Sequence, residues 1–229
     1  MKAITDPSGR DKLKLAVLIS GRGSNMAAIA RACLQGQIDA KPVVVISDRG
    51  DALGLAAAAA LGLSTVVIEA AQFENRVLFE AALAEAIERS GAELVVLAGF
   101  MRILSAPFVE RYTGRLLNIH PSLLPRYKGL GTHRRVLHAG EREHGASVHF
   151  VTAELDGGPV ICQARVPVRV EDTEQSLAAR VVLEEHRIYP LAIGLIAAGR
   201  LKLQGTAVML DGQVLKAPIV EEPSHGTHV

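Results

Sequence analysis

The sequence predicts an α/β fold: a Rossmann-like, mostly parallel twisted sheet with helices on both faces and an antiparallel addition in the C-terminal half. Short, largely apolar runs such as Leu13–Ser20 and Glu93–Ala98 are typical of strands that are buried on both faces of a parallel sheet. Segments with helical periodicity separate these runs, and strands that alternate with helices are typical of βαβ units.

The elements of the first half follow one another in a regular order. Strands are expected at Leu13–Ser20, Pro42–Ser47, Thr65–Ile68, Glu93–Ala98 and Leu116–Ile119. Helices are expected at Met26–Leu34, Ala52–Leu61 and Phe73–Arg89. The third helix has the clearest pattern, because the apolar residues Phe79, Leu83 and Ile87 recur every four residues along one face.

The pattern changes in the second half. Ala146–Phe150 alternates like a half-exposed strand, and Pro159–Val168 is expected to pair with it in antiparallel fashion. A long helix is expected at Leu177–Ala198. Short strands at Leu201–Leu203 and Ala207–Leu210 should follow it, separated by a turn at Gly205.

A chain of 229 residues is long enough for one domain with a substantial core. No internal repeat or linker interrupts it. We therefore expect a single domain over residues 13–216, with an N-terminal half of about 13–112 and a C-terminal half of about 113–216. Residues 1–12 and 217–229 are expected to form flexible ends.

Composition argues against several kinds of partner. The net charge of +1 gives no electrostatic footprint for nucleic acid, and aromatic residues make up only 3%. No apolar run reaches the ~18 residues of a membrane span. Two distant cysteines, Cys33 and Cys162, suggest no disulfide framework, which favours the reducing cytoplasm. We therefore expect a cytoplasmic protein that acts on small molecules, without nucleic-acid or membrane partners, as a monomer or weak homodimer.

The segment Gly21-Arg22-Gly23-Ser24-Asn25 stands between the first strand and its helix. Glycines let a backbone approach a ligand closely, and the N–H groups of a helix start attract anions. The segment lacks the third glycine of a dinucleotide fingerprint and the Gly-Lys-Ser/Thr of a nucleotide P-loop. A tight turn with a helix cap would also explain these residues. We interpret the segment as a site for a single phosphate group rather than a dinucleotide.

Asn118 and His120 stand at the end of the fifth strand. Because they are two residues apart, their side chains point to the same side of an extended chain. Pro121 and Pro125 then stop strand pairing and favour a rigid loop. A core histidine satisfied by backbone groups is the simpler explanation of a lone histidine. An amide neighbour at the carboxyl end of a strand favours catalysis instead.

Two further segments are candidates for the same site. Glu154–Pro159 is rich in turn residues, and a turn explains its glycines but not Asp156. A carboxylate near His120 would stabilise the charged imidazolium. Gly99–Leu104 follows a strand directly, a position that suits either plain core or the wall of a pocket.

The remaining histidines invite a metal interpretation: His133, His138, His144 and His149. Their spacing matches no zinc pattern and neither cysteine is near, so we expect surface or supporting roles, with His149 the closest to a strand end. No Ser, Cys or Lys is placed as a nucleophile, which favours direct transfer between two bound substrates. The residues alone thus indicate group transfer that involves a phosphorylated small molecule, with a histidine and an amide stabilising an oxyanion.

Four motifs resemble the phosphoribosylglycinamide formyltransferases of the folate-dependent formyltransferase family. They are Ser20–Asn25, Leu97–Leu104, Asn118–Pro125 and Leu155–Pro159, in the same order within about Leu13–Leu210. The resemblance implies the formyltransferase fold, with a phosphate-binding N-terminal half and a folate-binding C-terminal half. It also implies transfer of the formyl group of the co-substrate 10-formyltetrahydrofolate to the amine of glycinamide ribonucleotide, in de novo purine (IMP) biosynthesis.

The resemblance further implies roles for individual residues. Asn118, His120 and Asp156 match the catalytic triad, in which the first two stabilise a tetrahedral intermediate and the acid keeps the imidazole protonated. Glycinamide ribonucleotide would contact Gly23, Ser24, Asn25, Val182, Leu183, Glu184 and Glu185. The folate would contact Arg76, Met101, Arg102, Ile103, Leu104, Asn118, Thr152, Ala153, Glu154, Leu155 and Asp156. No metal is implied.

Two alternatives remain open. Formyltetrahydrofolate hydrolase shares the Asn/His/Asp set but gives the formyl group to water; it usually carries an N-terminal regulatory domain, whereas only Met1–Lys12 precedes the first strand here. A nucleotide-binding module without catalysis would not need all three side chains. Gly131 stands where the family often has a bulkier polar residue, which leaves the ligand contacts of that loop open.

Overall fold

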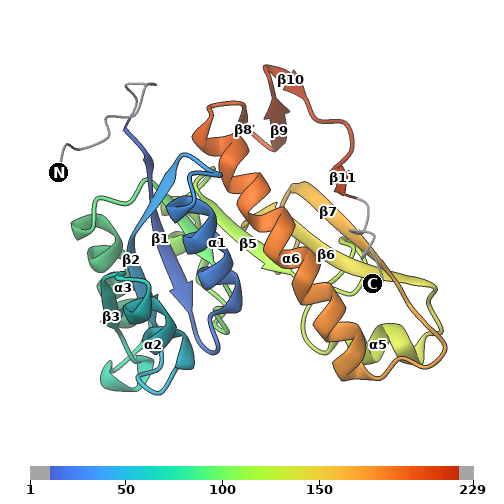
Figure 1. Cartoon of the computed structure of the whole chain (residues 1–229). Coiled ribbons are helices and arrows are strands. Elements are labelled where there is room, and N and C mark those ends of the chain that lie inside the picture. The colour runs from blue at the N-terminus through green and yellow to red at the C-terminus, as the bar shows by residue number, and fades with distance from the viewer. Residues whose placement is uncertain (1–10, 222–229) are drawn as a thin grey trace.

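The computed structural model describes residues 11–221 (Figure 1). Its strands are β1 (Leu13–Ile19), β2 (Ala40–Ser47), β3 (Thr65–Val67), β4 (Leu94–Leu97), β5 (Leu116–His120), β6 (Glu143–Phe150), β7 (Val160–Pro167), β8 (Leu201–Gln204), β9 (Ala207–Leu210), β10 (Gln213–Val214) and β11 (Ile219–Glu221). Its helices are α1 (Ser24–Leu34), α2 (Leu53–Ala60), α3 (Arg76–Arg89), α4 (Ala106–Arg111), α5 (Thr132–His138) and α6 (Glu174–Ala197), with a 3-10 turn, η1, at Ala70–Gln72.

Eight strands form one sheet in the order β11-β7-β6-β5-β4-β1-β2-β3, and β10-β9-β8 form a smaller one. From β3 to β5 all neighbouring strands are parallel, which confirms the predicted parallel sheet. The chain moves outward from β1 through β2 to β3 and then returns to the other side of β1 with β4 and β5. The strand order therefore reverses between β1 and β4. Open α/β sheets bind ligands outside the carboxyl ends of strands at such a reversal.

Helices cover both faces of the sheet, as the sequence predicts. Alternate residues of β1 enter two different cores. Leu15, Val17 and Ile19 join the cluster that includes α1 and α6, whereas Ala16 and Leu18 join the cluster that includes α3 and α4. All five are fully buried, which explains the uniformly apolar run. Figure 1 shows α1 and α6 in front of the sheet, and the two helices are in contact.

The start of α3 is set by a cap. The Asn75 side chain accepts a hydrogen bond from the N–H of Leu78 at 3.1 Å, so the helix begins at Arg76 rather than at Phe73 as expected. Arg76 is thereby placed in the first turn of α3.

The expectation of a half-exposed strand at Ala146–Phe150 is wrong. β6 is buried from His144 to its end, because α6 packs on it and the segment after β5 covers it as well. The hydroxyl of Ser147 accepts from the N–H of Leu124 at 3.0 Å and donates to the carbonyl of Ser122 at 2.6 Å. The polar residues that produce the alternating pattern are buried and hydrogen-bonded.

The antiparallel addition is confirmed, because β6 pairs in antiparallel fashion with both β5 and β7, and β8 does so with β9. The expected flexible end from residue 217 is wrong over Ile219–Glu221, since β11 pairs with β7. The guanidinium of Arg187 on α6 also donates to the Glu221 carboxylate at 3.2 Å. Residues 1–10 and 222–229, likewise expected to be flexible, lie outside the described residues.

Candidate active site

Three segments from neighbouring strands meet at one edge of the sheet. Gly21–Asn25 follows β1, Gly99–Leu104 follows β4, and Asn118 lies in β5 opposite the last residue of β4. Because β1, β4 and β5 are parallel neighbours, their carboxyl ends lie together. The first two segments are also tied directly, since the N–H of Met101 donates to the Ser20 hydroxyl at 2.8 Å. The structure thus brings together three motifs that the sequence singles out.

The start of α1 lies tightly against α2. Gly23 has a φ of 71°, and a Cβ placed on it would lie 2.8 Å from the Cα of Gly54, so no larger residue fits without a shift. The N–H of Gly54 donates to the carbonyl of Gly21 at 2.9 Å. Gly23 has no side chain to cap α1, so the N–H groups of the first turn, from Ser24 onward, are left for an external acceptor.

Asn25 joins α1 to α6. Its Nδ2 donates to the Oε2 of Glu185 at 2.7 Å, and both side chains are buried. Burial raises the pKa of Glu185, and the hydrogen bond from Asn25 opposes this effect. The Oδ1 of Asn25 is buried without a hydrogen-bond partner among the described residues. Two predicted substrate contacts, Asn25 on α1 and Glu185 on α6, are therefore in direct contact. The Oδ1 of Asn25 remains there as an acceptor without a donor among the described residues.

The other members of the predicted group on α6 point in different directions. Val182 is half-buried and lies three residues before Glu185, on the same face of the helix. Leu183 is 62% exposed. Glu184 is buried and pairs with Arg187, one turn further along. Glu185 and Val182 thus share the side that faces α1, whereas Leu183 and Glu184 do not.

Asn118, His120 and Asp156 are brought close together. The Nδ1 of His120 lies 3.4 Å from the Oδ2 of Asp156, which sits in the turn after β6 with a φ of 48°. The N–H of Gly129 donates to the same carboxylate oxygen at 2.9 Å. The side chain of Asp156 is 9% exposed and that of His120 is 8% exposed. A non-glycine residue at positive φ is strained, and such strain is typical of functional sites.

The imidazole of His120 faces acceptors on both sides. Its Nε2 lies 3.0 Å from the carbonyl oxygen of Tyr127, which can only accept, so Nε2 must carry a proton. Its Nδ1 faces the Asp156 carboxylate, and a lone pair there would point at negative charge. With Nε2 donating, Nδ1 can also donate only when the ring is doubly protonated. At 3.4 Å the contact between Nδ1 and the carboxylate is longer than an ordinary hydrogen bond, so Nδ1 can also contact an incoming oxygen.

His149 supports the amide of Asn118, a role that the sequence indicates only by its place near a strand end. Its Nδ1 lies 2.9 Å from the carbonyl oxygen of Phe150 and must donate to it, so its Nε2 is an acceptor. Burial lowers the pKa of His149, which favours this neutral form. The Nδ2 of Asn118 lies 3.2 Å from that Nε2 and donates to it. The amide orientation is thereby set, and Asn118 keeps a second N–H for another acceptor.

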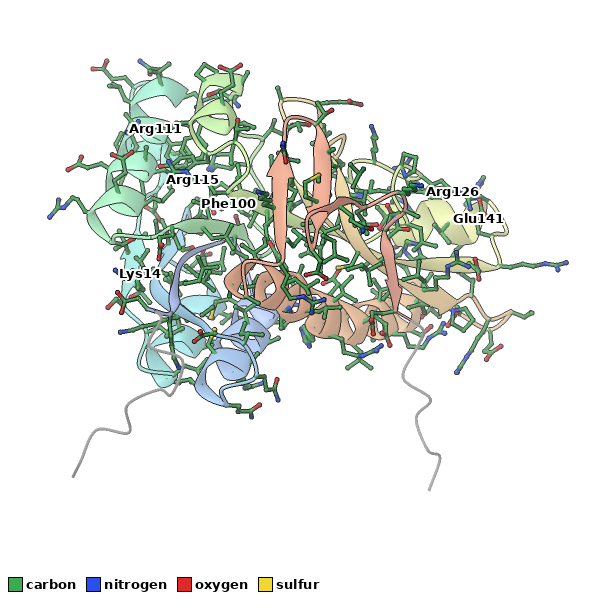
Figure 2. The ribbon with its side chains drawn as sticks, turned by 90° about the horizontal axis from the view of Figure 1, so that it is seen from above. Lys14, Phe100, Arg111, Arg115, Arg126 and Glu141 are labelled. Carbon is green, nitrogen blue, oxygen red and sulfur yellow. The ribbon has the colours of Figure 1, made fainter. Side chains whose placement is uncertain are left out.

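The loop after β5 is held in place at its far side. The guanidinium of Arg126 and the hydroxyl of Tyr127, the latter at 2.7 Å, both donate to the carboxylate of Glu141. Figure 2 shows Arg126 and Glu141 together at the end of the molecule opposite Arg111. These contacts hold the Tyr127 carbonyl against His120.

The predicted folate contacts form two borders of this cluster. In the first, Arg76 donates from Nη2 to the carbonyl of Ile103 at 2.7 Å. Met101 and Ile103 are 71% and 68% exposed, whereas Leu104 is buried. Large apolar side chains exposed beside a polar cluster suit a planar ligand. Arg102 lies in the same segment and pairs with Asp48.

The second border is the turn that leads into Asp156. Thr152 is half-buried, Ala153, Glu154 and Leu155 are exposed, and the Lys128 ammonium donates to the Glu154 carboxylate at 2.6 Å. Because the turn carries Asp156, these residues adjoin the catalytic candidates.

Within residues 11–221, no three His, Cys, Asp or Glu side chains gather closely enough to hold a metal ion. No helix in the same span is long and apolar enough to cross a membrane.

An open, mostly parallel sheet that gathers an amide, an imidazole and a carboxylate at the carboxyl ends of its central strands defines a group-transfer enzyme for small molecules. A family model described as formyl transferase matches residues 13–193. The chain belongs to the formyl transferase family.

Individual relatives agree with this family and confirm the resemblance. The phosphoribosylglycinamide formyltransferase of Escherichia coli (strain K12) is 52% identical over 203 residues, which cover 89% of this chain and 96% of that protein. The trifunctional purine biosynthetic protein adenosine-3 of Homo sapiens is 43% identical over 194 residues, 85% of this chain but 19% of the longer protein. The structure of the phosphoribosylglycinamide formyltransferase of Coxiella burnetii matches with a TM-score of 0.87 and 47% identity, covering 91% of this chain and 99% of that one.

Proposed function

We propose that this chain transfers the formyl group of 10-formyltetrahydrofolate to the amine of glycinamide ribonucleotide, a step of de novo purine biosynthesis. The names of the relatives support this reaction. The observation that carries it is the meeting of Asn118, His120 and Asp156 at the end of β5, with proton donors left for a developing oxyanion. The folate acts as co-substrate, and the proposal needs no metal.

In the proposed reaction the uncharged amine attacks the formyl carbon, and an electron pair of the carbonyl moves to its oxygen. The Nδ1–H of His120 and the second N–H of Asn118 donate to that oxygen as it becomes negative. Donors of this kind are each worth about 10²–10³ in rate. The attacking nitrogen then loses a proton and N10 of the folate gains one. The electron pair on the oxygen re-forms the carbonyl as the bond from N10 to the formyl carbon breaks. Asp156 keeps His120 charged and oriented throughout.

The same proposal assigns the phosphate of glycinamide ribonucleotide to the start of α1, at Gly23, Ser24 and Asn25. Uncapped N–H groups at a helix start and their dipole both favour an anion there. Glu185, which already accepts from Asn25, is assigned to the ribose hydroxyls. Val182 lies on the same face of α6 and would border this site.

The folate is assigned to the space between the Met101–Leu104 segment and the Thr152–Asp156 turn, with Arg76 at its border. The exposed side chains of Met101, Ile103 and Leu155 fit an aromatic ligand. We further propose that the protein works in the cytoplasm as a monomer or weak homodimer on small molecules alone.

The test is to supply 10-formyltetrahydrofolate with and without glycinamide ribonucleotide and to follow both tetrahydrofolate and the formylated amine. The proposal expects tetrahydrofolate release only with the amine present, in equal amount to the formylated product. Release at the same rate without the amine would favour the hydrolase. No release in either case would favour a binding module without catalysis.

A further inference from the structure

Lys128 and Glu154 form an ion pair between the two segments that hold His120. Lys128 lies in the segment after β5, next to Tyr127. Glu154 lies in the turn after β6, two residues before Asp156. The Nζ of Lys128 donates to the Oε1 of Glu154 at 2.6 Å. The lysine side chain is 34% exposed and the glutamate side chain 69%, so the pair lies at the surface beside the buried cluster.

Both segments carry a backbone conformation that needs support. Tyr127 has a φ of 58° and Asp156 a φ of 48°, and residues other than glycine keep such angles only where their surroundings hold them. In the part of the chain that the structure describes, two polar contacts join the segment after β5 to the turn after β6. One is the hydrogen bond from the N–H of Gly129 to Asp156, and the other is the ion pair of Lys128 with Glu154.

Other contacts hold the segment after β5 on its far side. Arg126, seen with Glu141 in Figure 2, donates to that acid, as does the hydroxyl of Tyr127. The guanidinium of Arg135 lies over the ring of Tyr127, 5.3 Å from the centroid. These contacts tie the segment to α5 and to the residues that follow it, not to the turn after β6. Lys128 supplies the side chain that reaches that turn.

Gly157 leaves room for the carboxylate of Glu154. A Cβ placed on Gly157 would lie 2.3 Å from the Cδ of Glu154 and 2.5 Å from its Oε2, so the glutamate side chain folds directly over this glycine. Gly157 is not among the glycines with a positive φ, so the backbone of the turn does not itself require glycine there. The missing side chain at Gly157 therefore allows Glu154 to take the position in which it meets Lys128.

We propose that Lys128 and Glu154 are positioning residues for His120. Their ion pair holds the segment after β5 against the turn after β6, which keeps the Tyr127 carbonyl and the Asp156 carboxylate at the two ring nitrogens. The inference rests on the proposed function, because the position of the imidazole matters only if it donates to the developing oxyanion. Neither side chain of the pair is assigned a contact with a reacting atom. The pair should therefore affect kcat and not the KM of glycinamide ribonucleotide, whose phosphate is assigned to α1.

Charge variants test the pair directly. Lys128→Gln removes the ammonium, and because exposed ion pairs contribute modestly, we expect kcat at saturating substrates to fall about threefold. Lys128→Arg keeps the charge and should keep the rate. Lys128→Glu and Glu154→Lys each place like charges together and should lower kcat further. The variant with both changes restores opposite charges and should recover most of the parent kcat. The KM of glycinamide ribonucleotide should stay within about twofold of the parent in every case.

Gly157→Ala tests the geometry without a change of charge. The three atoms nearest to the added methyl all belong to the flexible side chain of Glu154, so the carboxylate is displaced while the fold is retained, as circular dichroism would check. We expect the same fall in kcat, about threefold, as for Lys128→Gln. The two changes together should cause no further fall, because each breaks the same interaction.

Salt provides a second measurement on the same variants. From about 0.01 M to about 1 M salt the Debye length falls from ~30 Å to ~3 Å, so the difference in kcat between the parent and Lys128→Gln should shrink. Arg165→Gln is the matched control, because Arg165 pairs with Glu143 at the other end of β6 and both are exposed. It should leave kcat unchanged.

Three results would overturn the role of the pair while leaving formyl transfer intact. They are a charge-exchanged variant as slow as the single reversals, a Lys128→Gln variant with the parent kcat, and a rise in the KM of glycinamide ribonucleotide alone. A parent chain that transfers no formyl group would instead overturn the proposed function itself.

Discussion

His120 and His144 lie on neighbouring strands of one sheet, and both are buried, but the groups around their ring nitrogens differ. His120 faces a carbonyl at one nitrogen and a carboxylate at the other. The Nε2 of His144 lies 2.9 Å from the Nδ1 of His133, and within residues 11–221 its charged neighbours are His133 and His120 rather than a carboxylate. Burial above all, with the nearby charges of His133 and His120, lowers the pKa of His144 to about 4.

Burial alone therefore does not decide what a histidine does. Removing an imidazole from water disfavours its charged form, so a buried histidine without an anion stays neutral near pH 7. His120 differs in having an acceptor within reach of each ring nitrogen, the Tyr127 carbonyl at one and the Asp156 carboxylate at the other. One strand therefore carries a candidate proton donor and the next carries a histidine that resists protonation.

The largest effect should follow removal of His120. His120→Ala takes away the cationic donor, and we expect turnover to fall about 10³-fold while the affinity for both substrates changes little. Steady-state kinetics and equilibrium binding measure the two quantities. His138→Ala, on the exposed end of α5, serves as the control. Turnover within tenfold of the parent would remove His120 from the chemistry.

A smaller loss should follow neutralisation of the acid. Asp156→Asn retains an oxygen that can accept from Gly129, but the carboxylate charge beside Nδ1 of His120 is lost. We expect kcat to fall about 10²-fold with the fold intact, measured by kinetics and circular dichroism. Asp211→Asn, which neutralises an exposed acid paired with Arg200, should leave kcat unchanged. If both variants behave alike, the charge next to His120 is not what sets it apart from His144.

Removal of His149, which orients the amide of Asn118, should lower kcat by less than neutralisation of Asp156 does. His149→Leu removes the acceptor for Asn118, which is then free to turn, and we expect about a tenfold fall in kcat with unchanged KM values. His149→Gln restores an oxygen acceptor and should recover part of the rate. Equal kinetics for the two variants would show that the amide is oriented by something other than His149.

Replacement of His144 should have the smallest effect of these substitutions at neutral pH, because His144 acts on the pH dependence of the free energy of unfolding. Its pKa in the folded chain, about 4, lies below its ordinary value of 6.5, so the unfolded chain takes up this proton first as the pH falls. The stability due to the neutral ring is complete above pH 6.5, declines between pH 6.5 and about 4, and does not change further below that range. We expect the decline to cost about 1–3 kcal/mol.

His144→Asn should therefore make the free energy of unfolding less dependent on pH in this range, as measured by urea titration at several pH values. His138→Asn, at an exposed position, should keep the dependence of the parent. A His144→Asn variant as acid-sensitive as the parent would mean that His144 is not the group that resists protonation.

Much of the fold could be predicted from local patterns. β1 reads as a buried strand because consecutive residues enter the two cores, and α3 reads as a helix because one face is apolar. The same reasoning goes wrong in β6, where the polar residues His144, Ser147 and His149 are buried against hydrogen-bonding partners rather than exposed. An alternation of apolar and polar residues shows only which side chains are polar. Whether a polar side chain is exposed to water or buried depends on the hydrogen-bonding partners that other elements bring to it.

Local patterns in the sequence were enough for the order of β1 to β9 and of α1, α2, α3 and α6, but they missed α4, α5, β10 and β11. They also predicted the glycine segment at the start of α1 and the placement of Asn118 and His120 on one side of a strand. These depend on residues a few positions apart, whose geometry the backbone period dictates. The tertiary structure alone decided which distant polar groups meet: Asn25 with Glu185 across 160 positions, Asp156 with His120, and His149 under the amide of Asn118. Such meetings depend on how whole elements pack, and no local period in the sequence records them.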